Sequence, residues 1–234
     1  MFFYYYDWTY ILVLIGALIC IAASARVNSV FSRYSRVRSH SGLTGREAAE
    51  QILHRNGIYD VQVIHIAGNL TDHYNPGNKT LGLSDTVYNS TSVAAVGVAA
   101  HECGHAVQHS VGYAPLSIRG ALVPVANIGS MAAWPLIIIG LFMNGQTAAF
   151  FINLGILLFS AAVLFQLVTL PVEFNASNRA VKALETSGML YPDEVGSVKK
   201  VLGAAALTYV ASAAVMILQL LRLIILTGGR RRND

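Results

Sequence analysis

His101, Glu102 and His105 form an H-E-x-x-H pattern within the run Val98–Gln108. Four residues advance an α-helix by about 400°, so on a helix the two histidines share one face, a turn apart. Two imidazoles placed in this way can bind a single Zn²⁺ ion, and Glu102 then lies beside a water on that ion. Zinc lowers the pKa of the water, Glu102 accepts its proton, and the hydroxide attacks a peptide carbonyl. The spacing predicts a zinc-dependent hydrolytic centre.

A catalytic zinc site has three protein ligands and a water. Glu173 is the main candidate for the third ligand, because it is the only acidic residue between Glu102 and Glu185. His109 lies about 12 Å along the same helix from His101, so one ion cannot bind both. Cys103 points away from His101 and is expected to be structural. Four further histidines stay open as alternative ligands: His40, His54, His65 and His73.

Charged residues are scarce and unevenly distributed. Hydrophobic residues make up 54% and charged residues 12%, against about 25% charged in a typical soluble domain. The ranges 8–25, 120–172 and 201–221 contain no Asp, Glu, Lys, Arg or His. A membrane-spanning helix needs about 20 apolar residues, so the middle range can hold two spans and the others one each. We predict helices near 5–25, 120–142, 148–170 and 201–227, with a tight turn at 143–147 between the middle two.

The distribution of Lys and Arg predicts the orientation of these spans. Twelve of the 16 lie in two segments, eight in 26–119 and four in 171–200. With four spans both segments lie on the same side, and the excess of positive residues predicts the cytoplasmic side. We therefore expect a multi-pass protein of the bacterial inner membrane whose active site faces the cytoplasm. The first span lacks the basic start of a signal peptide, which favours its retention. A net charge of +4 is too small to indicate nucleic-acid binding.

The polar segment 26–119 predicts a small α+β module. Thr44 and Glu47 form a capping box at the start of a helix that ends at Gly57. Residues 60–67 and 80–84 predict strands, with a turn-rich stretch at 72–79 between them. Ser90–Ser92 offer caps for the helix that carries the H-E-x-x-H pattern. The expected division is 1–25 first span, 26–119 catalytic module, 120–170 membrane hairpin, 171–200 a helix with the third ligand, and 201–234 last span and basic tail.

Several strings outside the H-E-x-x-H pattern carry a family resemblance. A helix with H-E-x-x-H followed by Glu173 and Phe174 on a later helix resembles the gluzincin arrangement of HtpX-like and CAAX-prenyl membrane proteases. The strings Tyr74-Asn75-Pro76, Leu81–Ser84 and Val98–Gln108 are similar to the YugP family of bacterial neutral zinc metallopeptidases. The stretch Ala204–Ala211 also fits that family, so the resemblance covers nearly the whole chain.

The resemblance implies that His101, His105 and Glu173 are zinc ligands and that Glu102 is the general base. HtpX-like proteases place Asp four residues after the ligand Glu, where this chain has Ser177. A hydroxyl can still bond an imidazole, and Asn175 or Asn178 could supplement it. The candidates for oxyanion stabilisation are Arg179, Tyr209 and His73. The strand at 80–84 is expected to be either an edge for substrate addition or simple sheet structure.

The combined expectation is a mainly α membrane protein with about four transmembrane helices and a zincin-like module at the membrane surface. It predicts a membrane-embedded endopeptidase with one Zn²⁺ per chain. Its expected substrates are membrane or membrane-proximal proteins or peptides. The protein is expected to lie in the lipid bilayer and to bind no nucleic acid. The alternatives are an intramembrane site-2-type protease and a catalytically silent scaffold that keeps zinc for stability. The oligomeric state is not predicted.

Overall fold

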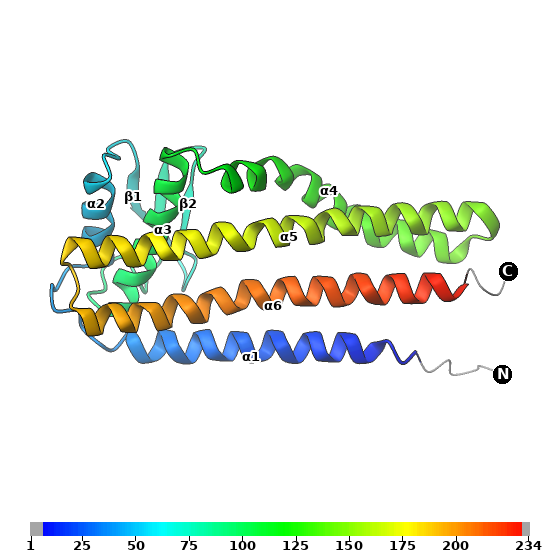
Figure 1. Cartoon of the computed structure of the whole chain (residues 1–234), viewed down its shortest axis with the longest axis horizontal. Helices are drawn as coiled ribbons and strands as arrows, with labels where there is room; N and C mark the ends of the chain where they lie inside the picture. The colour runs from blue at the N-terminus through cyan, green and yellow to red at the C-terminus, as the bar shows by residue number, and fades with distance from the viewer. Residues whose placement is uncertain (1–6, 231–234) are drawn as a thin grey trace. The chain divides into compact units, whose positions relative to one another are not determined.

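The computed structural model describes residues 7–230, so the first six residues of the predicted first span and the last four of the basic tail lie outside the described residues. Four helices are long and apolar enough to cross a membrane (Figure 1). They are α1 (Tyr10–Tyr34), α4 (Ala114–Phe142), α5 (Gly145–Ser187) and α6 (Pro192–Arg230). The predicted membrane class is therefore confirmed, although α1, α5 and α6 each run well beyond the uncharged ranges of the sequence.

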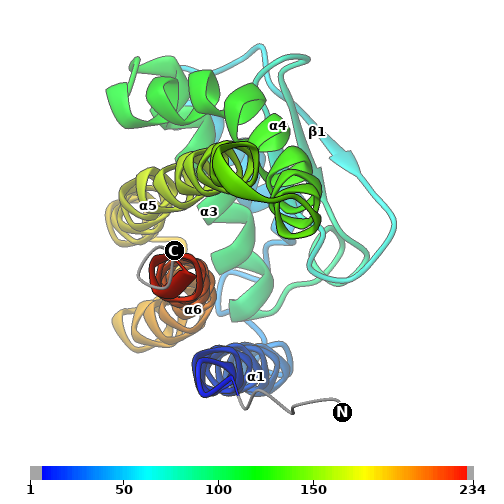
Figure 2. The ribbon, with the colours of Figure 1, turned by 90° about the vertical axis from the view of Figure 1, so that its right-hand side faces the viewer.

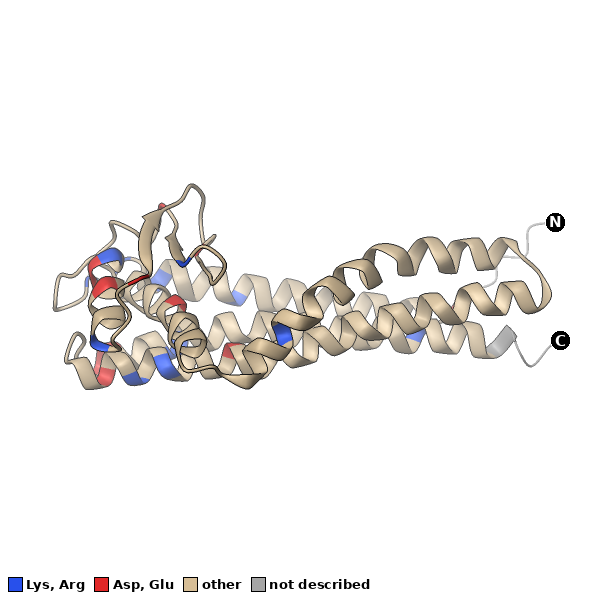
Figure 3. Ribbon diagram, turned by 90° about the horizontal axis from the view of Figure 1, so that it is seen from above, with Lys and Arg blue, Asp and Glu red and all other residues tan. Residues whose placement is uncertain are grey.

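Two compact units share these helices. The first comprises 1–23, 118–170 and 208–234, and the second comprises 24–117 and 171–207. Figure 3 shows that Lys, Arg, Asp and Glu gather on the elements of the second unit and are sparse along the long helices. Figure 2 shows α1, α5 and α6 close to end-on. The units divide the chain at nearly the positions where its charge content changes.

Close backbone contact holds the hairpin of α4 and α5 together in the first unit. A Cβ added to Gly129 would lie 2.6 Å from the Leu158 carbonyl oxygen, and one added to Gly155 would lie 2.8 Å from that of Ala133. Small residues of this kind let membrane helices approach closely. Only Met143 and Asn144 separate the two helices, and Gly145 has a φ of +63°, which glycine adopts at little cost.

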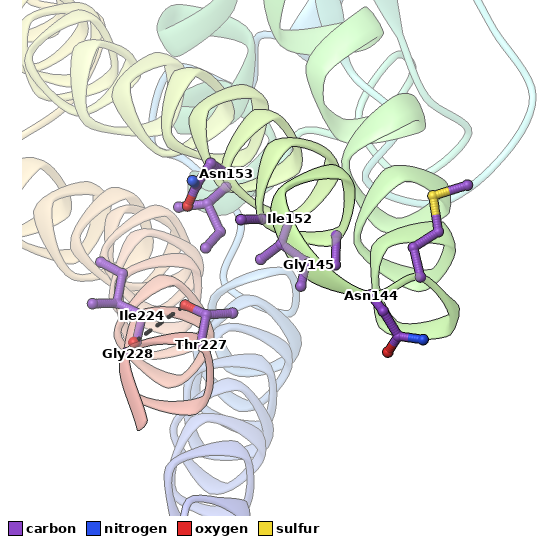
Figure 4. A pocket seen from close by; sticks show the side chains of 11 residues that line it. Asn144, Gly145, Ile152, Asn153, Ile224, Thr227 and Gly228 are labelled. Atoms are coloured by element: carbon purple, nitrogen blue, oxygen red, sulfur yellow. Dashed lines mark hydrogen bonds between the residues drawn. The ribbon is translucent and has the colours of Figure 1, made fainter. Parts of the chain in front are cut away.

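A cavity of about 570 Å³ lies in the same unit, beside the start of α5 and the end of α6 (Figure 4). Asn144, Ile152 and Asn153 line it from one side, and Ile224 and Thr227 line it from the other. The residues of the H-E-x-x-H pattern and Glu173 are not among its lining residues. The candidate site therefore lies elsewhere, in the second unit.

The second unit contains α2 (Gly45–Arg55), α3 (Val93–Ser110) and a three-stranded sheet. Its strands are β1 (Gln62–His65), β2 (His73–Asn75) and β3 (Thr80–Leu83), in the order β1-β3-β2. β1 is parallel to β3, with Val63 opposite Leu81, and β2 is antiparallel to it, with Tyr74 opposite Leu81. The capping box of α2 is present, since the Thr44 hydroxyl accepts from the Glu47 N–H and the Glu47 carboxylate accepts from the Thr44 N–H.

Three local predictions need correction. Residues 73–75 form β2 although the stretch 72–79 is rich in turn formers, because pairing with β3 outweighs local propensity. The segment 171–200 is not a separate helix: α5 continues through Pro171 to Ser187, and α6 begins at Pro192. Proline is tolerated within long membrane helices because neighbouring groups satisfy the backbone carbonyl that it leaves without a donor. Glu173 therefore lies inside a helix and not at a helix start.

Candidate metal centre

Helix α3 is a buried helix made largely of small residues. Its N-terminus is capped by the Ser92 hydroxyl, which accepts from the Ala95 N–H at 3.2 Å. Ala94, Ala95, Ala99 and Ala100 are fully buried. Because these side chains are short, neighbouring elements approach α3 closely on several sides. The helix is thereby fixed in the core of the second unit, and the H-E-x-x-H pattern is fixed with it.

The two histidines of the pattern meet Glu173 of α5 within this unit. Oε2 of Glu173 lies 3.3 Å from Nε2 of His101 and 3.4 Å from Nε2 of His105. The possible ligand atoms of all three residues lie within 4.8 Å of one another, and all three side chains are largely buried. Two ligands held about 2.0–2.1 Å from a tetrahedral zinc ion are about 3.3 Å apart. The spacing of these donors fits zinc.

The protonation of His105 gives a second test of the fit. Nδ1 of His105 lies 3.0 Å from Oε1 of Gln108, an amide oxygen that can only accept, so Nδ1 carries the proton. The neutral ring therefore presents the lone pair of Nε2 to the Glu173 carboxylate. Two lone pairs at this distance repel each other unless a cation lies between them. Burial lowers the pKa of His105, but the Glu173 and Glu102 carboxylates raise it more, so the net shift of this pKa is upward.

Gln108 is held by its own hydrogen bonds. It is fully buried, and its Nε2 donates to the Val172 carbonyl at 2.8 Å and to Oδ1 of Asn175 at 3.0 Å. The same Asn175 oxygen accepts from Nε of Arg179 at 2.7 Å. Because arginine only donates, this bond identifies the atom of Asn175 as the oxygen, and the orientation of Gln108 follows from it. The chain Arg179–Asn175–Gln108 thus fixes the tautomer of His105.

Ser177 contacts the other histidine. Its hydroxyl lies 3.1 Å from Nδ1 of His101, which leaves Nε2 directed at Glu173. A partner of this kind orients a metal-binding imidazole and increases its basicity. Ser177 therefore makes a hydroxyl-to-imidazole contact, as its position four residues after Glu173 predicted.

Glu102 is adjacent to His101 in sequence but has different surroundings. Glu102 is only 8% exposed, and its side chain makes no hydrogen bond or ion pair within residues 7–230. Its carboxylate is therefore not committed to a structural contact. Cys103, on the opposite face of α3, is fully buried and its Sγ lies 3.5 Å from the Ala49 carbonyl oxygen, so its role is structural.

Of the remaining sequence candidates, His73 contacts the Thr71 carbonyl and Asn178 is exposed, and neither is among the three clustered residues. Tyr209 belongs to the first unit. Arg179 is directed at Asn175 and not at Glu102 or Asp85. The alternative ligands are also placed elsewhere: His65 bonds Asp85, His109 bonds Tyr74, His40 contacts Tyr191, and His54 stacks on Tyr59.

Of the two alternatives for strand 80–84, simple sheet structure is confirmed and an edge for substrate addition is wrong. β3 is the central strand and pairs on both sides, so its backbone is not available for a substrate strand. β2 is an edge strand that contacts α3, and its Tyr74 hydroxyl bonds Nδ1 of His109 at 2.8 Å. The edge nearest the H-E-x-x-H helix is thus a strand that the sequence pattern did not predict.

Sequence comparison agrees with this geometry. Residues 9–228 match a family model described as "Putative neutral zinc metallopeptidase". The chain is also 48% identical, over 212 residues, to the protein named "Putative membrane protease YugP" of Bacillus subtilis, and the match covers 90% of this chain and 93% of that protein. No solved structure matches. The family model extends over almost the whole chain, from the first membrane helix to the last. The chain belongs to the neutral zinc metallopeptidase family.

Proposed function

We propose that this protein is a membrane-embedded zinc endopeptidase of the gluzincin type that binds one Zn²⁺ per chain. The observation that carries the proposal is the convergence of His101, His105 and Glu173, with nitrogen and oxygen atoms at the spacing of zinc ligands. Glu102, with no structural partner in the described chain, is then the general base. When bound, the ion would act as a Lewis acid that acidifies water and polarises a peptide carbonyl.

The chain's own residues would supply the remaining steps. Gln108 and Ser177 keep the Nδ1 protons of the histidines engaged, so that both Nε2 atoms stay directed at Glu173. Glu102 accepts a proton from the attacking water as its oxygen bonds to the peptide carbon. As the C–N bond breaks, Glu102 returns that proton to the leaving amine, so that no net proton is taken up or released at Glu102.

The site in this proposal faces the cytoplasm of a bacterial cell. The bias of Lys and Arg toward 26–119 and 171–200 supports this orientation. A site next to the membrane helices would cleave membrane proteins or membrane-proximal segments of proteins and peptides. The division into a first span, a catalytic module, a membrane hairpin, a ligand-bearing segment and a last span is part of the same proposal.

The test is a comparison of zinc content and proteolysis in detergent. Wild type and Glu102→Gln are each expected to bind about one zinc per chain, and Glu102→Gln to lose casein cleavage by at least a hundredfold, the scale of general-base contributions. Glu173→Ala should lose the metal. His109→Ala is the matched control, because His109 lies on the same helix but contacts Tyr74, and it should keep both properties.

Four results would contradict the proposal. Absence of zinc in the wild type would remove the metal centre. Equal cleavage by Glu102→Gln would remove the base. Zinc without any cleavage in the wild type, on casein or on membrane-protein fragments, would favour the zinc-stabilised scaffold instead. A zinc-bound protein that cleaves only within transmembrane segments would favour the site-2-type alternative.

A further inference from the structure

The second unit has a hollow of about 550 Å³ away from the metal centre, between the end of α1 and the beginning of α6. Arg26, Val30 and Arg33 line it from α1, and Lys200, Gly203 and Leu207 line it from α6. All these residues belong to the second unit. Neither zinc ligands nor Glu102 are among the lining residues, so the hollow has no role in the proposed hydrolysis.

The hollow is built by two facing helical stripes. The α1 residues have the spacing i, i+4, i+7 and the α6 residues the spacing i, i+3, i+7, so each set lies on one face of its helix. Gly203 keeps the α6 side open, because a Cβ added there would meet no heavy atom within 4 Å. A large side chain at this position would therefore extend into the hollow.

Its charge is positive and not neutralised by the protein. Arg26, Arg33 and Lys200 are exposed, and no carboxylate forms an ion pair with them in the part of the chain that the structure describes. Arg33 has one aromatic contact, with its guanidinium carbon 5.7 Å from the centre of the Tyr34 ring. The adjacent Lys199, which does not line the hollow, pairs with Glu185 at 2.8 Å. The pattern distinguishes a cationic hollow from an ordinary salt-bridged surface.

The sequence places these cations at the borders of membrane stretches. Arg26 directly follows the uncharged range 8–25, and Lys200 directly precedes the uncharged range 201–221. Residues at such borders lie at the depth of lipid headgroups. Cationic pockets between helices at this depth suit anionic headgroups, and each cation near the membrane surface adds to the attraction. The apolar Val30 and Leu207 in the same hollow suit the hydrocarbon attached to a headgroup.

We propose that this hollow is a binding site for one anionic phospholipid. The phosphate contacts Arg26, Arg33 and Lys200, and the first methylene groups of an acyl chain lie against Val30 and Leu207. The rise from Arg26 to Arg33 is about 10 Å, which lets the cations contact the headgroup at more than one level. A lipid at this site holds the beginning of α6 against the end of α1. The site is independent of the proposed protease activity.

Native mass spectrometry of the full-length protein in a neutral detergent tests the proposal. We expect one phosphatidylglycerol to stay bound per chain at concentrations about tenfold below those needed for phosphatidylcholine. Inorganic phosphate and soluble glycerophosphoglycerol should not displace the bound lipid when each is added at the concentration at which phosphatidylglycerol saturates the site. Equal retention of the two lipids, or displacement by inorganic phosphate, would overturn a phospholipid site.

Two pairs of variants separate a built site from general attraction to a charged membrane. Arg33→Gln with Lys200→Gln should weaken phosphatidylglycerol binding at least tenfold, from the loss of two cations near the headgroup. Arg36→Gln with Lys199→Gln removes the same net charge outside the hollow and should leave binding within twofold. Equal weakening in both double variants would overturn the proposal.

The second pair changes space without changing charge. Gly203→Leu fills the hollow and should abolish retention of the lipid, whereas Gly196→Leu, on the same helix with open space but outside the hollow, should not. Wild-type retention in Gly203→Leu would overturn the proposal. Helical content by circular dichroism, measured on every sample, shows that the variants are folded. Retention of the lipid does not depend on metal binding or on proteolysis. Failure of the protease proposal is therefore distinguishable from failure of this one.

Discussion

Gly104 of α3 lies directly against the backbone of Ala176 in α5. A Cβ on Gly104 would be 2.4 Å from the Ala176 carbonyl oxygen and 3.0 Å from its carbon. This contact lies one residue before His105 and three residues after Glu173 along their helices. The distance between the two ligand-bearing helices is therefore set at a point where only hydrogen fits.

Substituting Gly104 with alanine should disrupt the metal centre. The new methyl group meets backbone and not a flexible side chain, so the helices must separate, at a cost of about 1–3 kcal/mol in the free energy of unfolding. Separation also moves Glu173 away from both histidines. We expect Gly104→Ala to reduce zinc affinity, measured by competition with a chromogenic chelator, by at least tenfold.

Gly196→Ala is the control for this substitution. Gly196 lies in α6, and a Cβ there meets nothing within 4 Å. Alanine favours the helix by up to about 1 kcal/mol over glycine, so the thermal midpoint should stay or rise and zinc affinity should not change. Wild-type zinc affinity in Gly104→Ala would show that the close approach is not what positions the ligands.

Gln108 should influence zinc affinity without binding the metal. Its side chain cannot reach the metal because it is already hydrogen-bonded to His105, Val172 and Asn175. Gln108→Leu removes the acceptor of the His105 Nδ1 proton, so the ring loses its fixed tautomer and orientation. Loss of such a partner costs about 10–100-fold in metal affinity. Chelator competition measures the effect. His109→Leu, at the next residue on α3, should bind zinc as the wild type does, and equal affinities for both variants would rule out this role.

The ligand set could be predicted from the sequence because its signals are local or singular. His101 and His105 have a spacing that a helix converts directly into a shared face. Glu173 stands alone as an acidic residue after a long uncharged range. Gln108 has the same kind of signal, three residues after His105 on its face of the helix, but a glutamine inside an apolar helix has several possible roles. Its role follows only from Asn175 and Arg179, which are distant in sequence.

The elements that local patterns misplace are those that depend on distant partners. β2 has three residues and forms by pairing with β3, so the turn formers around it mislead. The central position of β3 is set by the parallel partner β1, which no alternation of residues encodes. Pro171 and the polar residues after it suggest a new element, yet α5 continues because its last turns pack in the core through Ala180 and Leu184. Tertiary packing determines each of these cases.

Ser177 offers a graded test of how strongly the position four residues after Glu173 influences the centre. Ser177→Ala removes the contact to Nδ1 of His101 and should lower zinc affinity about tenfold. Ser177→Asp supplies a charged acceptor and should raise zinc affinity above that of the wild type, since a carboxylate makes the imidazole more basic. Isothermal titration calorimetry with zinc measures the order of zinc affinity among the wild type and the two Ser177 variants. The exposed neighbour Asn178 is the control, and equal affinities for the alanine and aspartate variants would exclude an orienting contact.

Asp7 and Arg222 form an ion pair in the first unit, and it accounts for the one charged side chain within the apolar stretch of α6. Nη2 of Arg222 lies 2.9 Å from Oδ2 of Asp7, Nε donates to the Thr9 hydroxyl at 3.1 Å, and the guanidinium carbon lies 4.3 Å from the centre of the Tyr10 ring. The two charged side chains are 20% and 13% exposed. Since water screens them little, removing one partner and leaving the other charge unpaired should destabilise the protein more than breaking an exposed pair does.

A double-mutant cycle tests this contribution. Asp7→Asn and Arg222→Gln should each lower the free energy of unfolding in detergent, and the double variant should lose less than the sum of the two single losses. The exposed pair Lys199–Glu185, at 2.8 Å, is the control and should show a weaker coupling, of less than about 1 kcal/mol. Additive losses at Asp7 and Arg222 would mean that Arg222 is stabilised by Thr9 and Tyr10 alone. The expected coupling instead makes Asp7 the residue that lets a charged side chain remain in the last membrane helix.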